Sequence, residues 1–457
     1  MNENLDIKEK GTVGRRVAAN TGLMVGAKAV SAIIGLVSLM MITNTLPIAD
    51  VGIILFLHAY MLFFAEVATF QSWQAVIRFG THDVETKNIP SLGRLFRFCI
   101  ALDFVGAVVA FILAATGLIA LYKILPLLPS FQYQMEFESI DRFVKLGIPY
   151  CLLILVHQGG ASIGLFRLFD KFKPLALQVL VMPGCRLAGV LFAYTSGLGL
   201  YGYLGAWFFG SLCGYLALPL LALLELKSRN LLSVVFSAFP TLKIKRKGVW
   251  AFVWKANIDA SLATGTTHLP VLLVMPIFGP AFVSAYKIAD EIAKLLSTGV
   301  LLLDQVIYPE YARMMRRGQG DNIWKIVIKA SVVMLFTGLV FSAVVAVFGP
   351  QVIHIFGEGY EDAVMLSVLL VLAASLMGVL APIYPVFFAV GRPELAILAR
   401  GTGLVFYIGL IFVLSQYLGK TGPGWAAIFG NLLAVVFAVW LAKRALQAQA
   451  KSDMSTP

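Results

Sequence analysis

The chain has 457 residues, of which 59% are hydrophobic and 13% charged, and its mean hydropathy is +0.86. Soluble globular domains have about 45–50% apolar and about 25% charged residues, so the composition excludes a soluble protein and indicates an integral membrane protein. The net charge of +12 comes from basic residues spread over many loops, which excludes a nucleic-acid-binding segment.

Apolar segments close to the roughly 20 residues that a membrane-crossing helix needs recur along the whole chain. Turn residues and clusters of charge separate them. The first segment is about twice as long as a signal-peptide core, so we expect it to be retained. The sequence therefore predicts an all-α membrane protein with about twelve transmembrane helices, at 17–46, 50–77, 95–122, 143–168, 174–196, 199–226, 250–276, 281–308, 323–349, 363–390, 394–417 and 423–445.

The basic residues predict the orientation of these helices, because cytoplasmic loops are enriched in Lys and Arg. Of the 36 Lys and Arg, 26 lie in the segments on one side of the predicted helices, whereas the other side has only Lys123, Arg142, Lys145 and Lys420. We therefore expect both termini in the cytoplasm.

Three short segments of the first half have counterparts in the second half, in the same order. "LPIADVGIILF" (46–56) parallels "FGPAFVSAYKI" (278–288), "KPLALQVLV" (173–181) parallels "RPELAILAR" (392–400), and "GLYGYLGAWFFG" (199–210) parallels "GPGWAAIFG" (422–430). This pattern predicts an N-terminal lobe of six helices (1–226), a basic cytoplasmic linker (227–249) and a C-terminal lobe of six helices (250–457). Because six is even, we expect a pseudo-twofold axis along the membrane normal.

Two local features modify this scheme. The linker has an apolar centre and basic ends, which predicts a helix lying on an anionic membrane surface. In the seventh helix, Gly265, Pro270 and Pro276 predict a bend or break.

Charged residues inside the predicted helices are the candidates for function. A charge at the centre of a membrane helix costs about 2.5 to 3.5 kcal/mol if it faces lipid, so these residues must pair with one another or line a wet cavity. The basic ones are Lys28, Arg186, Lys255, Lys287, Lys294 and Arg400, and the acidic ones are Glu66, Asp103, Asp259, Asp290, Glu291 and Asp304.

Four of these charges lie within residues 286–296, "YKIADEIAKLL". Lys287 and Glu291 are four residues apart, as are Asp290 and Lys294, so all four share one stripe of a helix and can neutralise one another. We expect this stripe to face a wet cavity. The alternative is that the helix projects outward and its membrane span begins near Ile292.

Lys28 and Lys255 occupy comparable places, on the first helix of each half. Lys28 lies about 12 residues into its helix, too deep to reach the headgroups easily, whereas Lys255 lies about 6 residues in and could snorkel. For Arg186 and Arg400, ligand binding and a structural contact between helices remain equal alternatives.

Other chemistry has little support in the sequence. No glycine-rich nucleotide motif occurs, since "LGKTG" near residue 420 lacks the earlier glycine. The four cysteines and five histidines are scattered, so we expect no disulfide, metal site or cofactor. Most outer loops are only a few residues long, which argues against an enzyme.

The two six-helix halves, the basic inner loops, "FGEGYEDA" (356–363) and "GRPELA" (391–396) resemble the polysaccharide-transporter branch of the multidrug/oligosaccharidyl-lipid/polysaccharide (MOP) flippase superfamily, which includes the multidrug-exporting MATE proteins. The resemblance implies alternating access by two lobes in a bacterial inner membrane. It also implies a cationic cavity for polyprenyl-pyrophosphate-linked oligosaccharides. Lipid-II flippases of this superfamily have arginine on their first helix, and Lys28 stands in the comparable place here.

From the resemblance we expect a flippase for lipid-linked oligosaccharide, with six candidate substrate-binding residues: Lys28, Arg186, Lys255, Lys287, Lys294 and Arg400. Its expected partners are membrane lipids and other polysaccharide-assembly proteins. One alternative is a drug or cation antiporter of the same architecture, with the candidate ion-coupling residues Asp259, Asp290, Glu291 and Asp304. Another alternative is a membrane enzyme acting on lipid-linked sugars.

The predicted topology can be tested with reporter fusions. Reporters after Gly248 and Pro457 should report cytoplasm, whereas those after Pro47, Phe278 and Gly357 should report the outside. A reporter after Gly248 that reports the outside would contradict the division into two lobes with the same orientation.

Overall fold

The computed structural model describes residues 13–124, 137–316, 320–390, 392 and 394–455, and the regular elements in these ranges are all helices. The first ten are α1 (Val13–Thr43), α2 (Ile48–Ala68), α3 (Ser72–Glu85), α4 (Ile89–Ile124), α5 (Phe137–Cys151), α6 (Leu153–Val156), α7 (Gly160–Leu168), α8 (Phe172–Thr195), α9 (Leu200–Ser228) and α10 (Leu232–Val235). The others are α11 (Val249–Arg316), α12 (Gly320–His354), α13 (Asp362–Leu380), α14 (Tyr384–Ala389), α15 (Glu394–Leu418), the 3₁₀ turn η3 (Gly419–Thr421) and α16 (Gly422–Ser455).

Ten segments of the described chain are long and apolar enough to cross a membrane. Two of them, Val249–Leu296 and Glu394–Gln447, each contain two helical stretches joined by a turn. The ten segments thus accommodate the twelve predicted crossings, and the predicted all-α membrane fold is confirmed.

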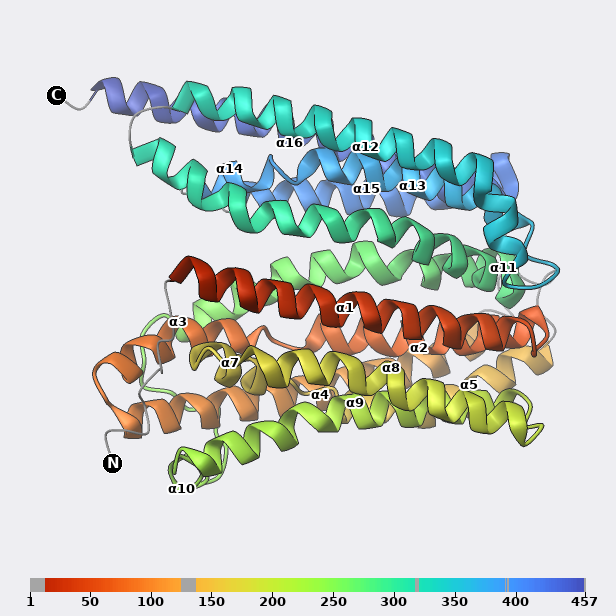
Figure 1. The fold of residues 1–457 in the computed structure, drawn as a ribbon, viewed down its shortest axis with the longest axis horizontal. Coiled ribbons are helices and arrows are strands. Elements are labelled where there is room, and N and C mark those ends of the chain that lie inside the picture. Colours follow the sequence, from red (N-terminus) through yellow and green to blue (C-terminus); the bar gives the residue numbers. More distant parts are fainter. Residues whose placement is uncertain (1–12, 125–136, 317–319, 391, 393, 456–457) are drawn as a thin grey trace. The chain divides into compact units, whose positions relative to one another are not determined.

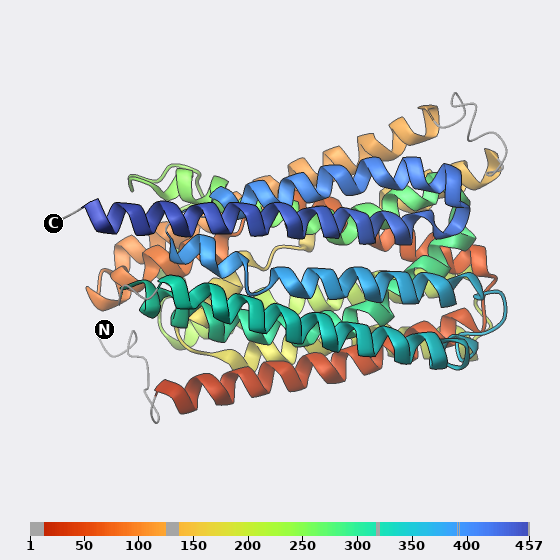
Figure 2. The same ribbon diagram turned by 90° about the horizontal axis from the view of Figure 1, so that it is seen from above.

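The chain divides into two compact units, Met1–Thr264 and Gly265–Pro457. In the first, α8 packs along α9, and α1 packs along α8 (Figure 1). In the second, α12 packs on α13, and α16 packs on both α13 and α15; Figure 2 shows α12 in teal and α13, α15 and α16 in blue. The division falls inside α11, so that the first turns of this helix belong to the first unit. The predicted lobe boundary at 227–249 stays a prediction.

The predicted linker helix is wrong for most of its length. Only the single turn α10 is helical, and the chain from Phe236 to Gly248 is irregular. Side chains of other helices hold it: Arg97 of α4 donates hydrogen bonds to the Val234 carbonyl at 2.6 Å and to Ser237 Oγ at 2.7 Å. Arg246 pairs with the buried Asp83 of α3 at 2.9 Å. The predicted helix is thus replaced by irregular chain anchored through Arg97 and Arg246, whereas its predicted place on the membrane surface stays a prediction.

Three of the predicted crossings are interrupted by short non-helical stretches. The segment predicted as 50–77 is interrupted at Thr69–Gln71, between α2 and α3. The segment predicted as 143–168 is interrupted at His157–Gly159, between α6 and α7, and the one predicted as 363–390 at Ala381–Ile383. Irregular backbone within a membrane must find hydrogen-bond partners within the protein, because lipid offers none.

The helix α11 keeps helical backbone angles through Gly265, Pro270 and Pro276, so the break predicted at these residues is wrong. Its non-helical residue is Gly279, with φ 80° and ψ 177°. That region of backbone space is almost restricted to glycine, because a side chain clashes there. Gly279 therefore permits the turn between the two halves of α11, within the stretch 277–280 left between the predicted seventh and eighth helices.

The turn at Gly279 yields a stability prediction. The substitution Gly279→Ala should lower the free energy of unfolding by about 1–3 kcal/mol, because alanine is strained at this backbone conformation. The matched control is Gly409→Ala on α15, where an added Cβ has open space and helical backbone; alanine should there stabilise by up to about 1 kcal/mol. Unfolding of the purified protein in detergent measures the free energy change of both variants. Equal effects of the two substitutions would contradict the role of Gly279 in the turn.

Candidate functional site

The buried carboxylate of Asp103 joins two of the broken helices in the first unit. It lies on α4 and is 3% exposed. Its Oδ2 accepts hydrogen bonds from Ser72 Oγ at 2.9 Å and from the Ala161 backbone N–H at 3.0 Å. These residues stand at the starts of α3 and α7, where backbone N–H groups lack helical partners and favour negative charge. Asp103 therefore holds both breaks in place.

The packing at this junction leaves no room for a larger residue. A Cβ at Gly160 would lie 2.1 Å from Ser72 Oγ and 2.9 Å from Asp103 Oδ2. The other carboxylate oxygen, Oδ1, is buried and finds no hydrogen-bond partner in the described part of the chain. Sequence reasoning identified Asp103 as a charge in the membrane but assigned it no role. The signal that could have found it is the polar, glycine-rich "HQGGAS" (157–162) inside an apolar span.

A second polar junction ties the end of α2 to the first half of α11. Thr264 Oγ1 donates a hydrogen bond to Glu66 Oε2 at 3.0 Å, and Ser261 Oγ donates one to the Val67 carbonyl at 3.0 Å. Asp259, a predicted ion-coupling residue two positions before Ser261 on the same helix, is half-buried and also interacts within the protein.

Arg186 lies in a polar network among α2, α5, α8 and α9. Its Nη2 is 3.3 Å from His58 Nε2 and 3.1 Å from Ser211 Oγ, and its Cζ lies 4.4 Å from the centroid of the Trp207 ring. His58 Nδ1 is in turn 3.0 Å from the Tyr150 hydroxyl. These contacts give Arg186 a role in joining helices; its predicted contact with substrate stays a prediction.

The four charges of residues 286–296 form a closed cluster in the second half of α11. Lys287 Nζ lies 2.9 Å from Asp290 and 3.1 Å from Glu291, and Lys294 Nζ lies 2.8 Å and 3.0 Å from the same two carboxylates. The two pairs expected at a spacing of four residues are confirmed, and two more pairs form at a spacing of three. Each lysine thus neutralises both acids.

This cluster lies well inside a continuous helix. Lys287 follows the turn at Gly279 by about 12 Å and Lys294 by about 22 Å, at 1.5 Å per residue. The helix continues from the turn to Arg316, as it would both for a cluster inside the membrane and for a helix that projects outward before a span starting near Ile292, so both alternatives stay predictions. Beside the cluster, the buried hydroxyls of Tyr286 and Tyr407 are 3.2 Å apart. The exposed fractions of the Lys287 and Asp290 side chains are only 13% and 21%.

Lys28 and Lys255 differ from Arg186 and from the charges of the α11 cluster. Each of the two lysines is exposed and has no hydrogen bond or ion pair within the described residues. Lys28 lies about 22 Å along α1 from Val13, and Lys255 lies about 9 Å along α11 from Val249. Arg400 of α15 is half-buried, with its Cζ 5.2 Å from the centroid of the Tyr384 ring. The side chain of the predicted Asp304 lies outside the described residues.

The structure therefore brings together four of the ten candidate residues, Lys287, Asp290, Glu291 and Lys294. In the first unit it places Lys28 on α1, Arg186 on α8, and Lys255 and Asp259 one turn apart on α11; in the second unit it places Arg400 on α15. No group of three His, Cys, Asp or Glu side chains in the described ranges could hold a metal ion.

This arrangement of helices is shared with known transporters. A multidrug-resistance transporter of the MATE family in the MOP superfamily, in an inward-facing conformation, superposes with a TM-score of 0.74 at 14% identity, covering 93% of this chain and 96% of that chain. A MOP superfamily transporter from Pyrococcus furiosus Vc1, for which a binding pocket of reversed polarity suggests a different function, superposes with a TM-score of 0.62 at 15% identity, covering 96% and 99% of the two chains. The chain thus has the MATE-like fold of MOP transporters.

A curated relative exists at the level of sequence. The "Inner membrane protein YghQ" of Escherichia coli K12 is 27% identical over 351 residues, which cover 76% of this chain and 95% of that protein. No family model matches the chain.

The charge cluster of α11 yields a second stability prediction. The substitution Asp290→Asn should lower the free energy of unfolding by about 2–3 kcal/mol, because it leaves two lysines facing one acid at membrane depth. Adding Lys287→Met to Asp290→Asn should recover more than half of this loss, since the Lys294–Glu291 pair at 3.0 Å then remains balanced.

The matched control is Asp362→Asn. Asp362 pairs with Lys420 at 2.6 Å, but the two side chains are 41% and 59% exposed, so the change should cost less than about 1 kcal/mol. Unfolding in detergent by increasing amounts of SDS measures all three variants. If Asp290→Asn and Asp362→Asn lower the free energy of unfolding equally, the charges of the α11 cluster are as well solvated as an ion pair on the surface.

Proposed function

We propose that this protein is a flippase that moves a polyprenyl-pyrophosphate-linked oligosaccharide from the cytoplasmic to the outer leaflet of a bacterial inner membrane, without making or breaking covalent bonds. The MATE-like fold supports transport by alternating access of two lobes. The relative YghQ, named as an inner membrane protein, supports the membrane assignment. The substrate class rests on the distribution of charge and on the family resemblance.

The observation that carries the proposal is an imbalance in the pairing of charges within the membrane. The acids Glu66 and Asp103 accept hydrogen bonds, and Asp290 and Glu291 are held by lysines. Lys28, in contrast, is exposed at membrane depth and has no partner within the described residues. The charges in the predicted spans are equal in number, but among those whose side chains the structure describes, the ones without a partner, Lys28 and Lys255, are cations. This favours an anionic substrate.

The physical chemistry of the substrate agrees with such cations. A sugar–pyrophosphate headgroup cannot cross about 30 Å of hydrocarbon unaided, because it would lose its hydration. Fixed ammonium groups in a wet cleft replace part of that hydration through charge-assisted hydrogen bonds. We infer that Lys28 binds the pyrophosphate and that Lys255 makes a second contact with it. The polyprenyl tail stays in the lipid.

The competing antiporter hypothesis needs carboxylates that can bind a cation. Asp290 and Glu291 would first have to leave Lys287 and Lys294, which lie within 3.1 Å of them. The reversed pocket polarity described for the Pyrococcus furiosus transporter supports the idea that one fold serves substrates of different charge.

The proposed partners of this protein are the other proteins of surface-polysaccharide assembly.

The test is a deletion strain with leaflet-resolved analysis of its polyprenyl-linked glycans. Loss of the protein should cause finished oligosaccharide units to accumulate facing the cytoplasm. Accumulation of unfinished glycan would indicate an enzyme, and unchanged glycans with altered resistance to toxic cations would indicate the antiporter.

Complementation of that strain tests the role of Lys28. Lys28→Gln should lower the rate of translocation at least about 10-fold, the loss of one charge-assisted contact of about 1.5–3 kcal/mol, whereas Lys28→Arg should retain most of it. The control is Lys420→Gln, an exposed lysine paired with Asp362, which should complement fully. Full activity of Lys28→Gln would contradict the proposed contact.

A further inference from the structure

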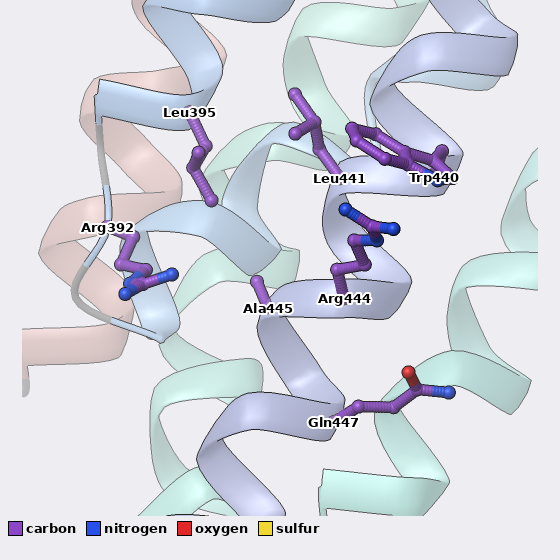
Figure 3. Close-up of a pocket in the computed structure, with 7 residues that line it drawn as sticks. All are labelled: Arg392, Leu395, Trp440, Leu441, Arg444, Ala445 and Gln447. Atoms are coloured by element: carbon purple, nitrogen blue, oxygen red, sulfur yellow. The ribbon is translucent and has the colours of Figure 1, made fainter.

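A pocket of about 410 Å³ lies in the second unit, between the start of α15 and residues 440–447 in the second half of α16 (Figure 3). This volume is within the range of about 300–1,000 Å³ that small-molecule sites have. Its floor is apolar: Leu441 and Ala445 are buried, and Leu395 is half-buried. None of the residues that the charge analysis of the membrane selected lines it.

Two arginines stand at the rim, and Figure 3 shows them on opposite sides of Ala445. Arg444 is exposed, and its Cζ lies 4.1 Å from the centroid of the Trp440 ring, which orients the guanidinium group. Arg392 is held through its backbone, because its N–H donates a hydrogen bond to the Phe387 carbonyl at 2.8 Å. Neither arginine has an ion pair with a carboxylate in the part of the chain that the structure describes. The rim thus presents two charges that an anion can bind.

The depth of the pocket in the membrane can be estimated from α16. Arg444 lies about 33 Å along the helix from Gly422, at 1.5 Å per residue, and Trp440 lies about 27 Å from it. The hydrocarbon core is about 30 Å thick, so the ring of Trp440 falls at the boundary of the core and the arginines fall among the headgroups. Before Lys443, the residues of α16 are apolar or small apart from Asn431, and after Lys443 they are mostly polar or small.

We propose that this pocket binds the phosphate of an anionic phospholipid from the surrounding membrane. Arg392 and Arg444 donate hydrogen bonds to the phosphate oxygens, and the acyl chains lie along Leu395 and Trp440. A planar guanidinium group binds phosphate through two parallel N–H bonds, and each basic residue near an anionic surface adds about 1 kcal/mol to binding. An apolar floor beside the phosphate-binding arginines fits the acyl chains of a lipid and leaves a free phosphate ion without partners on that side.

The experiment uses the full chain in nanodiscs of phosphatidylcholine with increasing amounts of phosphatidylglycerol that has brominated acyl chains. Bromine quenches nearby tryptophan fluorescence, and the difference between the wild type and Trp440→Phe isolates the signal of Trp440 from the other six tryptophans. Trp440 should be quenched at a lower lipid fraction by brominated phosphatidylglycerol than by brominated phosphatidylcholine.

The double variant Arg392→Gln/Arg444→Gln should weaken the apparent association of phosphatidylglycerol by about 25-fold, since each arginine contributes about five-fold. Arg392→Lys/Arg444→Lys should keep most of the binding and confirms that the fold tolerates changes here. The matched control is Lys443→Gln, because Lys443 is the neighbour of Arg444 but lies over the ring of Trp324 at 5.3 Å. Because Lys443 does not line the pocket, its loss should weaken the association by no more than the roughly five-fold that a single basic residue near an anionic surface contributes, well short of the double variant.

Two results would overturn the proposal. One is equal quenching of Trp440 by both lipids, with no effect of the glutamine variants. The other is complete relief of the phosphatidylglycerol effect by millimolar inorganic phosphate, which would make the pocket a site for a free anion.

Discussion

A charge inside the hydrocarbon must be neutralised, hydrogen-bonded or kept wet, and the described structure meets this requirement in three distinct ways. The cluster of α11 neutralises itself through four ion pairs. Arg186 is surrounded by His58, Ser211 and the Trp207 ring. Lys28 has neither arrangement within the described residues, and the proposed function assigns its solvation to water or a bound anion. The proposed function follows from this third case.

The same requirement applies to the backbone. The breaks at Thr69–Gln71 and His157–Gly159 free N–H groups at a depth where lipid cannot satisfy them. Asp103 accepts a hydrogen bond from each of the helices that follow, through Ser72 Oγ and the Ala161 N–H. In this way one buried carboxylate from α4 supports irregular chain in two neighbouring segments. Broken helices of this kind commonly line the substrate path in transporters.

The sequence predicted those features that depend on local composition and spacing. Hydropathy located the crossings, and four-residue spacing paired Lys287 with Glu291 and Asp290 with Lys294. The breaks within crossings escaped prediction, because hydropathy averages over about 20 residues and cannot resolve a three-residue interruption. The role of Asp103 depends on Ala161, 58 positions away in the chain. Likewise, the lipid pocket joins Arg392 to Arg444 only through the packing of α15 on α16.

The central claim, that Lys28 faces water, can be tested on α1 itself by the labelling of single cysteines with a charged, lipid-insoluble thiol reagent in a protein lacking the four native cysteines. Ile33 is the reference for an apolar surface, because it is 64% exposed on the same helix, and Ser38 is the reference for a buried site. The account predicts that Lys28→Cys is labelled and that Ile33→Cys and Ser38→Cys are protected. Protection of Lys28→Cys to the same extent as Ile33→Cys, with and without substrate lipid, would contradict it.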